Sequence, residues 1–158
     1  MEALEIRQES IKQAVDIKVY PTVKGMNRAS KNFIKKHGLE QVDFTYNDHC
    51  KRTCMALTIP YSADGWAHNT IMLTGNSADG ILFNLMAHES VHVGCNIVTD
   101  LASEGLLQLT DDPEYNKELI EELIADITGN LSGLFANWRG GWDIDSDGFE
   151  LLDGGLIK

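Results

Sequence analysis

Five consecutive residues in the middle of the chain, His88-Glu89-Ser90-Val91-His92, form an H-E-x-x-H motif inside an apolar stretch that predicts a helix. Because an α-helix has about 3.6 residues per turn, His88 and His92 lie on one face, one turn apart. Two imidazoles at this spacing can bind one zinc ion, and Glu89 can accept a proton from zinc-activated water. The motif therefore requires a helix here and predicts a metal, a general base and a hydrolytic reaction.

Composition limits the size of the fold and the class of partner. The chain has 158 residues, the size of a single domain, and 43% of them are hydrophobic, enough for one core. The formal net charge is −11, with 24 acidic and 13 basic residues. We expect no nucleic-acid partner, because phosphate binding requires clustered lysine and arginine side chains.

Three features of the sequence bear on location. No apolar run reaches the roughly 18 residues that a membrane-spanning helix needs, so we expect no membrane partner. The first residues, 1–7, lack the basic and apolar regions of a signal peptide. The three cysteines, Cys50, Cys54 and Cys95, are an odd number, which argues against a disulfide framework. We expect a protein of the reducing cytoplasm that is not secreted by a signal peptide.

The remaining pattern predicts an α+β fold in one domain over residues 1–138, followed by a Gly- and Asp-rich irregular tail over residues 139–158. Runs of β-branched residues indicate strands, and apolar periodicity with capping residues indicates helices. The predicted strands cover residues 15–20, 42–46, 55–59 and 70–74, and the predicted helices cover 27–37, about 77 to 102, and 114–138. For residues 61–68 the sequence predicts a loop. The motif helix has apolar residues on more than one face, which predicts a buried helix with Gly94 as a weak point.

Acidic residues of the last predicted helix offer a third metal ligand. A catalytic zinc usually has three protein ligands and leaves one position for water. Glu122 and Asp126 are four residues apart and share a helix face, whereas Glu121 is rotated away by one position. Glu118 lies on the same face as Glu122, so helix spacing alone leaves both as candidates.

Together, the two helix motifs resemble a known family. An H-E-x-x-H helix followed by a helix with E-x-x-x-D is the pattern of gluzincin-type metallopeptidases, the thermolysin-like group. A closer similarity is to small phage-encoded zincin-like proteins, which have Ala-His-Glu-x-Val-His and then Glu-Glu-x-x-Ala-Tyr. The corresponding residues here are 87–92 and 121–126, with Asp126 where the phage pattern commonly has tyrosine. The order of elements is similar from about residue 17 to 134, and the two helix motifs are its specific part.

The resemblance implies a zincin-like fold and a complete metal site. A small mixed, mostly antiparallel sheet is expected to pack on the H-E-x-x-H helix, with the glutamate-bearing helix beside it. Glu122 is implied as the third zinc ligand. Asp126 is implied as the carboxylate that binds the far ring nitrogen of a histidine ligand, which fixes the tautomer and raises ligand basicity. The strand at residues 70–74 is implied as the sheet edge that pairs with an extended peptide substrate.

Two functions of different classes follow. The first is a zinc-dependent metallohydrolase, most directly a peptidase acting on a peptide or protein substrate, with Glu89 as the general base. The second is a phage virion or accessory protein with a zincin-like fold, a structural or vestigial metal site, and phage structural proteins as partners. The expected location is the host cytoplasm or the virion. An open coordination position favours the enzyme, and a fourth protein ligand favours the structural protein.

A developing oxyanion needs a hydrogen-bond donor, and three residues of the sequence are candidates for this role. Tyr115 precedes Glu122 by less than two turns of the same predicted helix and could donate such a hydrogen bond. His49 and His68 could do so from the strand side, although core or surface roles are the ordinary ones for each. Gluzincins usually have a further downstream histidine for this role, and this chain has none after His92.

Two other groups of potential ligands are weaker candidates. His49, Cys50 and Cys54 lie close in sequence, but no fourth ligand at zinc-knuckle spacing accompanies them. Asp143, Asp145 and Asp147 match the first half of an EF-hand loop that could bind Ca²⁺. The glutamate that ends such a loop is replaced by a glycine, which favours an ordinary polar tail.

Overall fold

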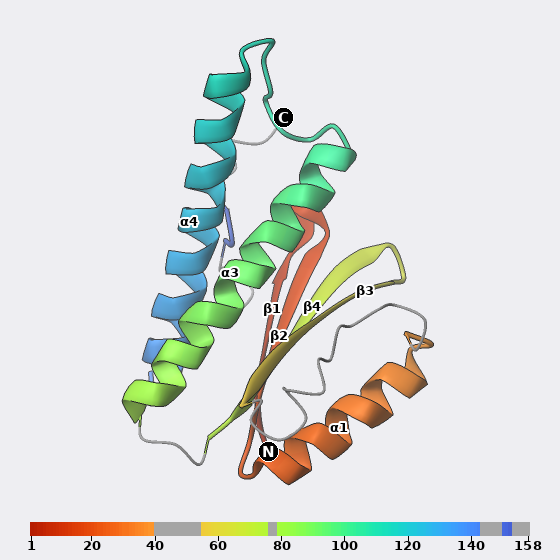
Figure 1. Cartoon of the computed structure of the whole chain (residues 1–158), viewed down its shortest axis with the longest axis vertical. Helices are drawn as coiled ribbons and strands as arrows, with labels where there is room; N and C mark the ends of the chain where they lie inside the picture. The colour runs from red at the N-terminus through yellow and green to blue at the C-terminus, as the bar shows by residue number, and fades with distance from the viewer. Residues whose placement is uncertain (40–54, 76–78, 143–149, 153–158) are drawn as a thin grey trace.

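The structure, a computed structural model, describes residues 1–39, 55–75, 79–142 and 150–152 (Figure 1). Its strands are β1 (Glu2–Gln8), β2 (Gln13–Tyr20), β3 (Ala56–Ala63) and β4 (Trp66–Thr74), and its helices are η1 (Glu9–Ile11, a 3-10 turn), α1 (Val23–Lys36), α3 (Asp79–Ser103) and α4 (Pro113–Arg139). The predicted α+β class is confirmed. None of the helices in the described part of the chain combines the length and apolar character needed to cross a membrane. The strand predicted at residues 42–46 lies outside the described residues.

The four strands form one mixed sheet in the order β1-β2-β4-β3. The pairs β1/β2 and β3/β4 are antiparallel and β2/β4 is parallel, which confirms a small, mostly antiparallel mixed sheet. The prediction that residues 70–74 form the sheet edge is wrong, because β4 lies between β2 and β3. Ile71, Met72 and Leu73 are all fully buried, as is usual for a strand covered on both faces. Among the described strands, β3 is the edge on this side.

Helices cover both faces of the sheet (Figure 1). Helices α3 and α4 pack on one face, where side chains such as Val15, Ile17 and Ile71 join the main hydrophobic core. Helix α1 covers the other face around a smaller cluster of Met26, Leu57, Ile59 and Met72. This arrangement follows from strand geometry, because successive side chains point to opposite faces.

The loop predicted at residues 61–68 is wrong, because a tight β-hairpin occupies this segment. Strand β3 continues to Ala63 and β4 begins at Trp66. The connection is Asp64-Gly65, and both residues have positive φ (56° and 79°), as a two-residue type I′ turn requires. Asp-Gly between two extended segments is a strong local signal for a hairpin. Strand β1 was also missed, because it is an edge strand with charged residues on its uncovered face.

The two long helices form an antiparallel pair at the predicted positions. Helix α4 begins at Pro113, one residue before the predicted start at residue 114. The Asp112 side chain caps it by accepting a hydrogen bond from the Glu114 backbone N–H at 3.0 Å. Helix α3 runs through Gly94 without a break. A Cβ atom at Gly94 would lie 3.2 Å from the carbonyl oxygen of Ile124. Gly94 is therefore a point of close contact between the helices.

A pair of glycine substitutions tests this contact. Gly94→Val is expected to lower the free energy of unfolding by about 1–3 kcal/mol, because the added methyl groups overpack the contact with α4. Gly129→Ala is the control, because it lies on the exposed face of α4 with open space at its Cβ. That change is expected to raise the free energy of unfolding by about 0.5–1 kcal/mol through helix propensity. Urea denaturation measures both, and equal stabilisation by the two changes would show that the close contact is absent.

Part of the predicted tail belongs to the core. Leu151 and Leu152 are fully buried in the main hydrophobic cluster. The Gln8 side chain accepts hydrogen bonds from the backbone N–H groups of Leu151 (2.7 Å) and Leu152 (3.2 Å) and donates one to the Leu152 carbonyl oxygen (3.1 Å). The Asn130 side chain donates a hydrogen bond to the Leu151 carbonyl oxygen at 3.0 Å. This short segment therefore joins β1 to α4.

Candidate functional site

The two histidines of the H-E-x-x-H motif lie together on α3. Both side chains are exposed, and the Nε2 atoms of His88 and His92 are 3.3 Å apart. A tetrahedral zinc ion with zinc–nitrogen bonds of about 2.0–2.1 Å requires two ligand nitrogens about 3.3–3.4 Å apart. The pair therefore has the separation that binding one zinc ion requires.

Glu89 lies between α3 and the sheet. Its side chain is only 5% exposed, although the neighbouring histidine side chains are exposed. Its Oε2 atom accepts a hydrogen bond from the Thr58 hydroxyl of β3 at 2.5 Å. A buried carboxylate requires such a partner, because an unpaired buried charge costs several kcal/mol. The general-base candidate is thus held against β3, beside the histidine pair.

Packing of α3 explains why the histidines face outward. Met86, Val93 and Ile97 are buried on one face, and the Asn96 side chain donates a hydrogen bond to Asn69 of β4 at 2.8 Å. The face that meets α4 includes Gly94. The remainder of the helix is exposed at residues such as Ile81, Phe83 and Val91, so the prediction of a buried helix holds only for the faces that meet the sheet and α4.

The structure does not bring Glu122 or Asp126 to the histidine pair. Ile124 is the residue of α4 that meets Gly94 of α3. Glu122 and Asp126 are each two residues from Ile124, about 200° around the helix, and both are exposed. In residues 1–39, 55–75, 79–142 and 150–152, no three histidine, cysteine, aspartate or glutamate side chains form a group that could hold a metal ion.

Local spacing correctly placed Glu122 and Asp126 on one face but could not determine which face of α4 meets α3. Burial of Leu123, Ile127 and Leu131 sets that rotation, because a helix places its apolar side chains in the core. The third-ligand role of Glu122 and the supporting role of Asp126 therefore gain no support from the described arrangement.

Tyr115 is also far from the motif. It lies in the first turn of α4, at the connection with the end of α3, and is 46% exposed. His92 is eleven residues before the end of α3 at Ser103, which corresponds to about 16 Å along the helix axis. The predicted oxyanion role of Tyr115 therefore has no geometric basis in this structure.

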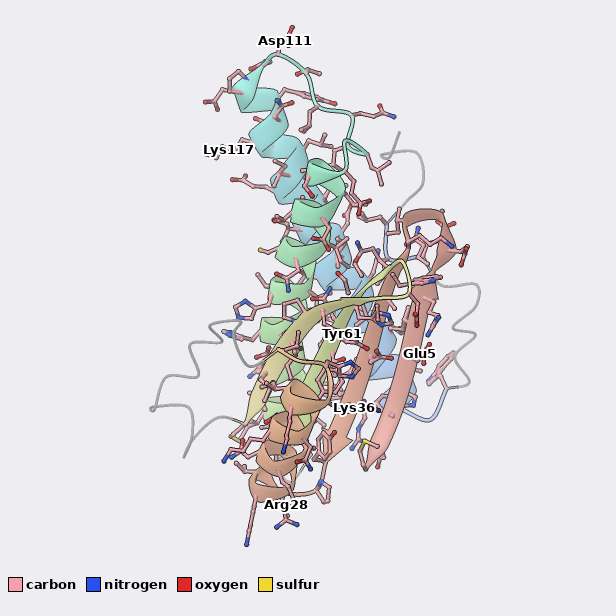
Figure 2. All side chains as sticks on the ribbon, turned by 90° about the vertical axis from the view of Figure 1, so that its right-hand side faces the viewer. Glu5, Arg28, Lys36, Tyr61, Asp111 and Lys117 are labelled. Atoms are coloured by element: carbon pink, nitrogen blue, oxygen red, sulfur yellow. The ribbon has the colours of Figure 1, made fainter. Side chains whose placement is uncertain are left out.

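His68 lies on the opposite face of the sheet from Glu89. Its ring stacks on Tyr61, with centroids 4.6 Å apart, and the adjacent Asn69 is the residue that faces α3. Its Nδ1 atom is 3.8 Å from Oδ2 of Asp16, beyond hydrogen-bond distance. Figure 2, seen from the α1 side, shows the labelled Tyr61 and Glu5 side chains on this face. His68 therefore cannot act on a substrate at the H-E-x-x-H motif.

Two raised pKa values on the face of the sheet covered by α1 were not predicted from the sequence. Burial raises the pKa of the Asp16 carboxyl above its usual range, and the charge of Glu5 raises it further. Burial also raises the pKa of the Tyr61 hydroxyl. No sequence motif linked these residues, because they come from different strands that only the sheet brings together.

Several candidates cannot be placed. His49, Cys50 and Cys54 lie outside the described residues, as do the calcium candidates Asp143, Asp145 and Asp147. Cys95 lies on α3 with an exposed, free thiol. Thr58 is a contact of Glu89 that was not predicted from the sequence, and its signal was weak: a polar residue between the buried Leu57 and Ile59 of a strand.

No protein-family model, curated protein or solved structure matches this chain. The resemblance to zincins therefore rests on the two helix motifs, and the function must be argued from the geometry of the site.

Proposed function

We propose that the protein is a zinc-dependent metallohydrolase that cleaves peptide bonds, with His88 and His92 as zinc ligands and Glu89 as general base. The separation of 3.3 Å between the two Nε2 atoms is the observation that carries the proposal, because it equals the spacing of two ligands on one tetrahedral zinc ion. Burial of Glu89 immediately next to this pair supports the assignment of a base.

Each residue has a defined role in this proposal. A zinc ion bound there supplies Lewis acidity, which polarises a carbonyl group and makes water more acidic. Glu89 accepts the proton of the attacking water and passes it to the leaving amine. The substrate is a peptide or protein, and an extended segment could pair with β3, which is an edge among the described strands and contacts the motif helix through Thr58.

The alternative is a phage virion or accessory protein with a structural or vestigial metal site, which a fourth protein ligand at the zinc would favour. The described residues contain no third side chain that completes the metal group. A two-histidine site binds zinc more weakly than the three-ligand site of a catalytic centre. Glu122 remains the third ligand implied by the resemblance. For Glu122 to reach the histidine pair, α4 would have to turn about its axis.

Metal analysis tests the proposed site. After loading with zinc and removal of the excess, the wild-type protein is expected to hold one zinc ion per chain, and His88→Ala and His92→Ala to hold far less. His37→Ala, at the far end of α1, is the matched control and is expected to keep the metal. Zinc at 100 times its dissociation constant is expected to stabilise the wild-type fold by about 2.7 kcal/mol, so chelation should lower its melting temperature and hardly change that of His88→Ala.

The same measurement assigns the third ligand. If the resemblance holds, Glu122→Ala weakens zinc binding and Glu121→Ala does not. Equal zinc affinity in both variants would exclude Glu122, in agreement with its exposed position on α4. A wild-type protein without stoichiometric zinc would contradict the metal site itself.

A further inference from the structure

The hydrogen bond between Thr58 and Glu89 joins residues 31 positions apart in sequence. The Thr58 Oγ1 and Glu89 Oε2 atoms are 2.5 Å apart, a short hydrogen bond between two oxygen atoms. A threonine hydroxyl has a single proton to donate. In this bond the Thr58 hydroxyl donates and the Glu89 carboxylate oxygen accepts.

The sheet holds Thr58 in place. Its neighbours Leu57 and Ile59 are buried in the cluster under α1, so the alternation of the strand turns Thr58 towards α3. Thr58 is also paired with Ile71 of strand β4, whose side chain is fully buried. A β-branched side chain has few allowed χ1 rotamers, so the hydroxyl has little freedom to move. The donor is thus more rigid than a side chain on a loop.

We propose that Thr58 is the positioning residue for the general base. By occupying Oε2 of Glu89, it fixes the orientation of the carboxylate and leaves Oε1 as the oxygen that accepts the proton. The inference rests on the proposed hydrolase function, because it concerns how Glu89 performs its role. An undirected carboxylate would accept the proton less efficiently, since proton transfer requires the acceptor within hydrogen-bond reach.

Two substitutions of Thr58 distinguish the effect of its hydroxyl group from the effect of its side-chain shape. Thr58→Val keeps the shape and removes the donor, and Thr58→Ser keeps the donor. The expected kcat of zinc-loaded Thr58→Val is lower by about 10- to 100-fold, the effect of a hydrogen bond to a charged group worth about 1.5–3 kcal/mol. Zinc content and KM are expected to stay near the wild-type values, and Thr58→Ser to recover most of kcat.

A second readout does not depend on activity. In the metal-free wild-type protein, proton NMR is expected to show a Thr58 hydroxyl proton that is protected from exchange and close to Glu89. A wild-type kcat in Thr58→Val, an equal loss in Thr58→Ser, or the absence of this proton would overturn the proposal for Thr58. A protected hydroxyl in a zinc-loaded wild-type protein without hydrolytic activity would instead overturn the hydrolase function, and the positioning role with it.

Discussion

Glu89→Gln is expected to abolish most peptide hydrolysis and to leave the bound zinc and the fold unchanged. The amide keeps the size of the side chain, and its oxygen can still accept the hydrogen bond from Thr58. It cannot take up a proton from water, so kcat/KM should fall by about 10²- to 10⁴-fold, the usual contribution of general base catalysis. Assays on a broad peptide library, with zinc content measured on the same samples, provide the test.

The control for this experiment is Glu121→Gln, an exposed glutamate on α4 that should keep wild-type activity. If the zinc-loaded wild-type protein cleaves no peptide, the enzyme hypothesis loses its main support and the structural alternative replaces it. If Glu89→Gln changes zinc content and melting temperature while the rate stays constant, Glu89 is part of a structural site.

Leu152→Ala is expected to lower the free energy of unfolding by about 2–5 kcal/mol, the usual cost of removing a fully buried leucine side chain. Domains of this size have a total stability of about 5–15 kcal/mol, so the variant should be substantially destabilised. The reason is that Leu151 and Leu152 fill the core between β1 and α4, where Gln8 and Asn130 bind their backbone.

Leu109→Ala is the matched control, because Leu109 is 41% exposed in the connection between α3 and α4. The expected decrease in the free energy of unfolding of this variant is below about 1 kcal/mol, as for most surface substitutions. Urea denaturation of both variants gives the comparison. Equal, small losses would show that residues 150–152 do not dock in the core.

Elements with strong local signals were predictable. Helix α4 was located almost to the residue, because Pro113 marks its start and apolar spacing marks its length. Strands β2 and β4 were found from β-branched runs, although both proved longer than predicted. The hairpin at Asp64-Gly65 was missed although its signal is local, since the polar residues around it suggested a loop.

The position of His88 relative to His92 was determined by the sequence itself. Both residues lie in one helix, and the helical repeat places side chains four residues apart on the same face whatever surrounds them. The structure confirms this placement with the short distance between the two ring nitrogens. A pair of histidines at this spacing needs no tertiary contact to form.

Only the tertiary structure decided what surrounds that pair. The partner of Glu89, the rotation of α4 that turns Glu122 away, and the docking of Leu151 and Leu152 all join residues far apart in sequence. Such contacts depend on which apolar faces are buried together, and several arrangements satisfy the same local pattern of apolar and polar residues. Helix geometry thus fixed the two histidines, whereas packing of the whole core fixed their neighbours.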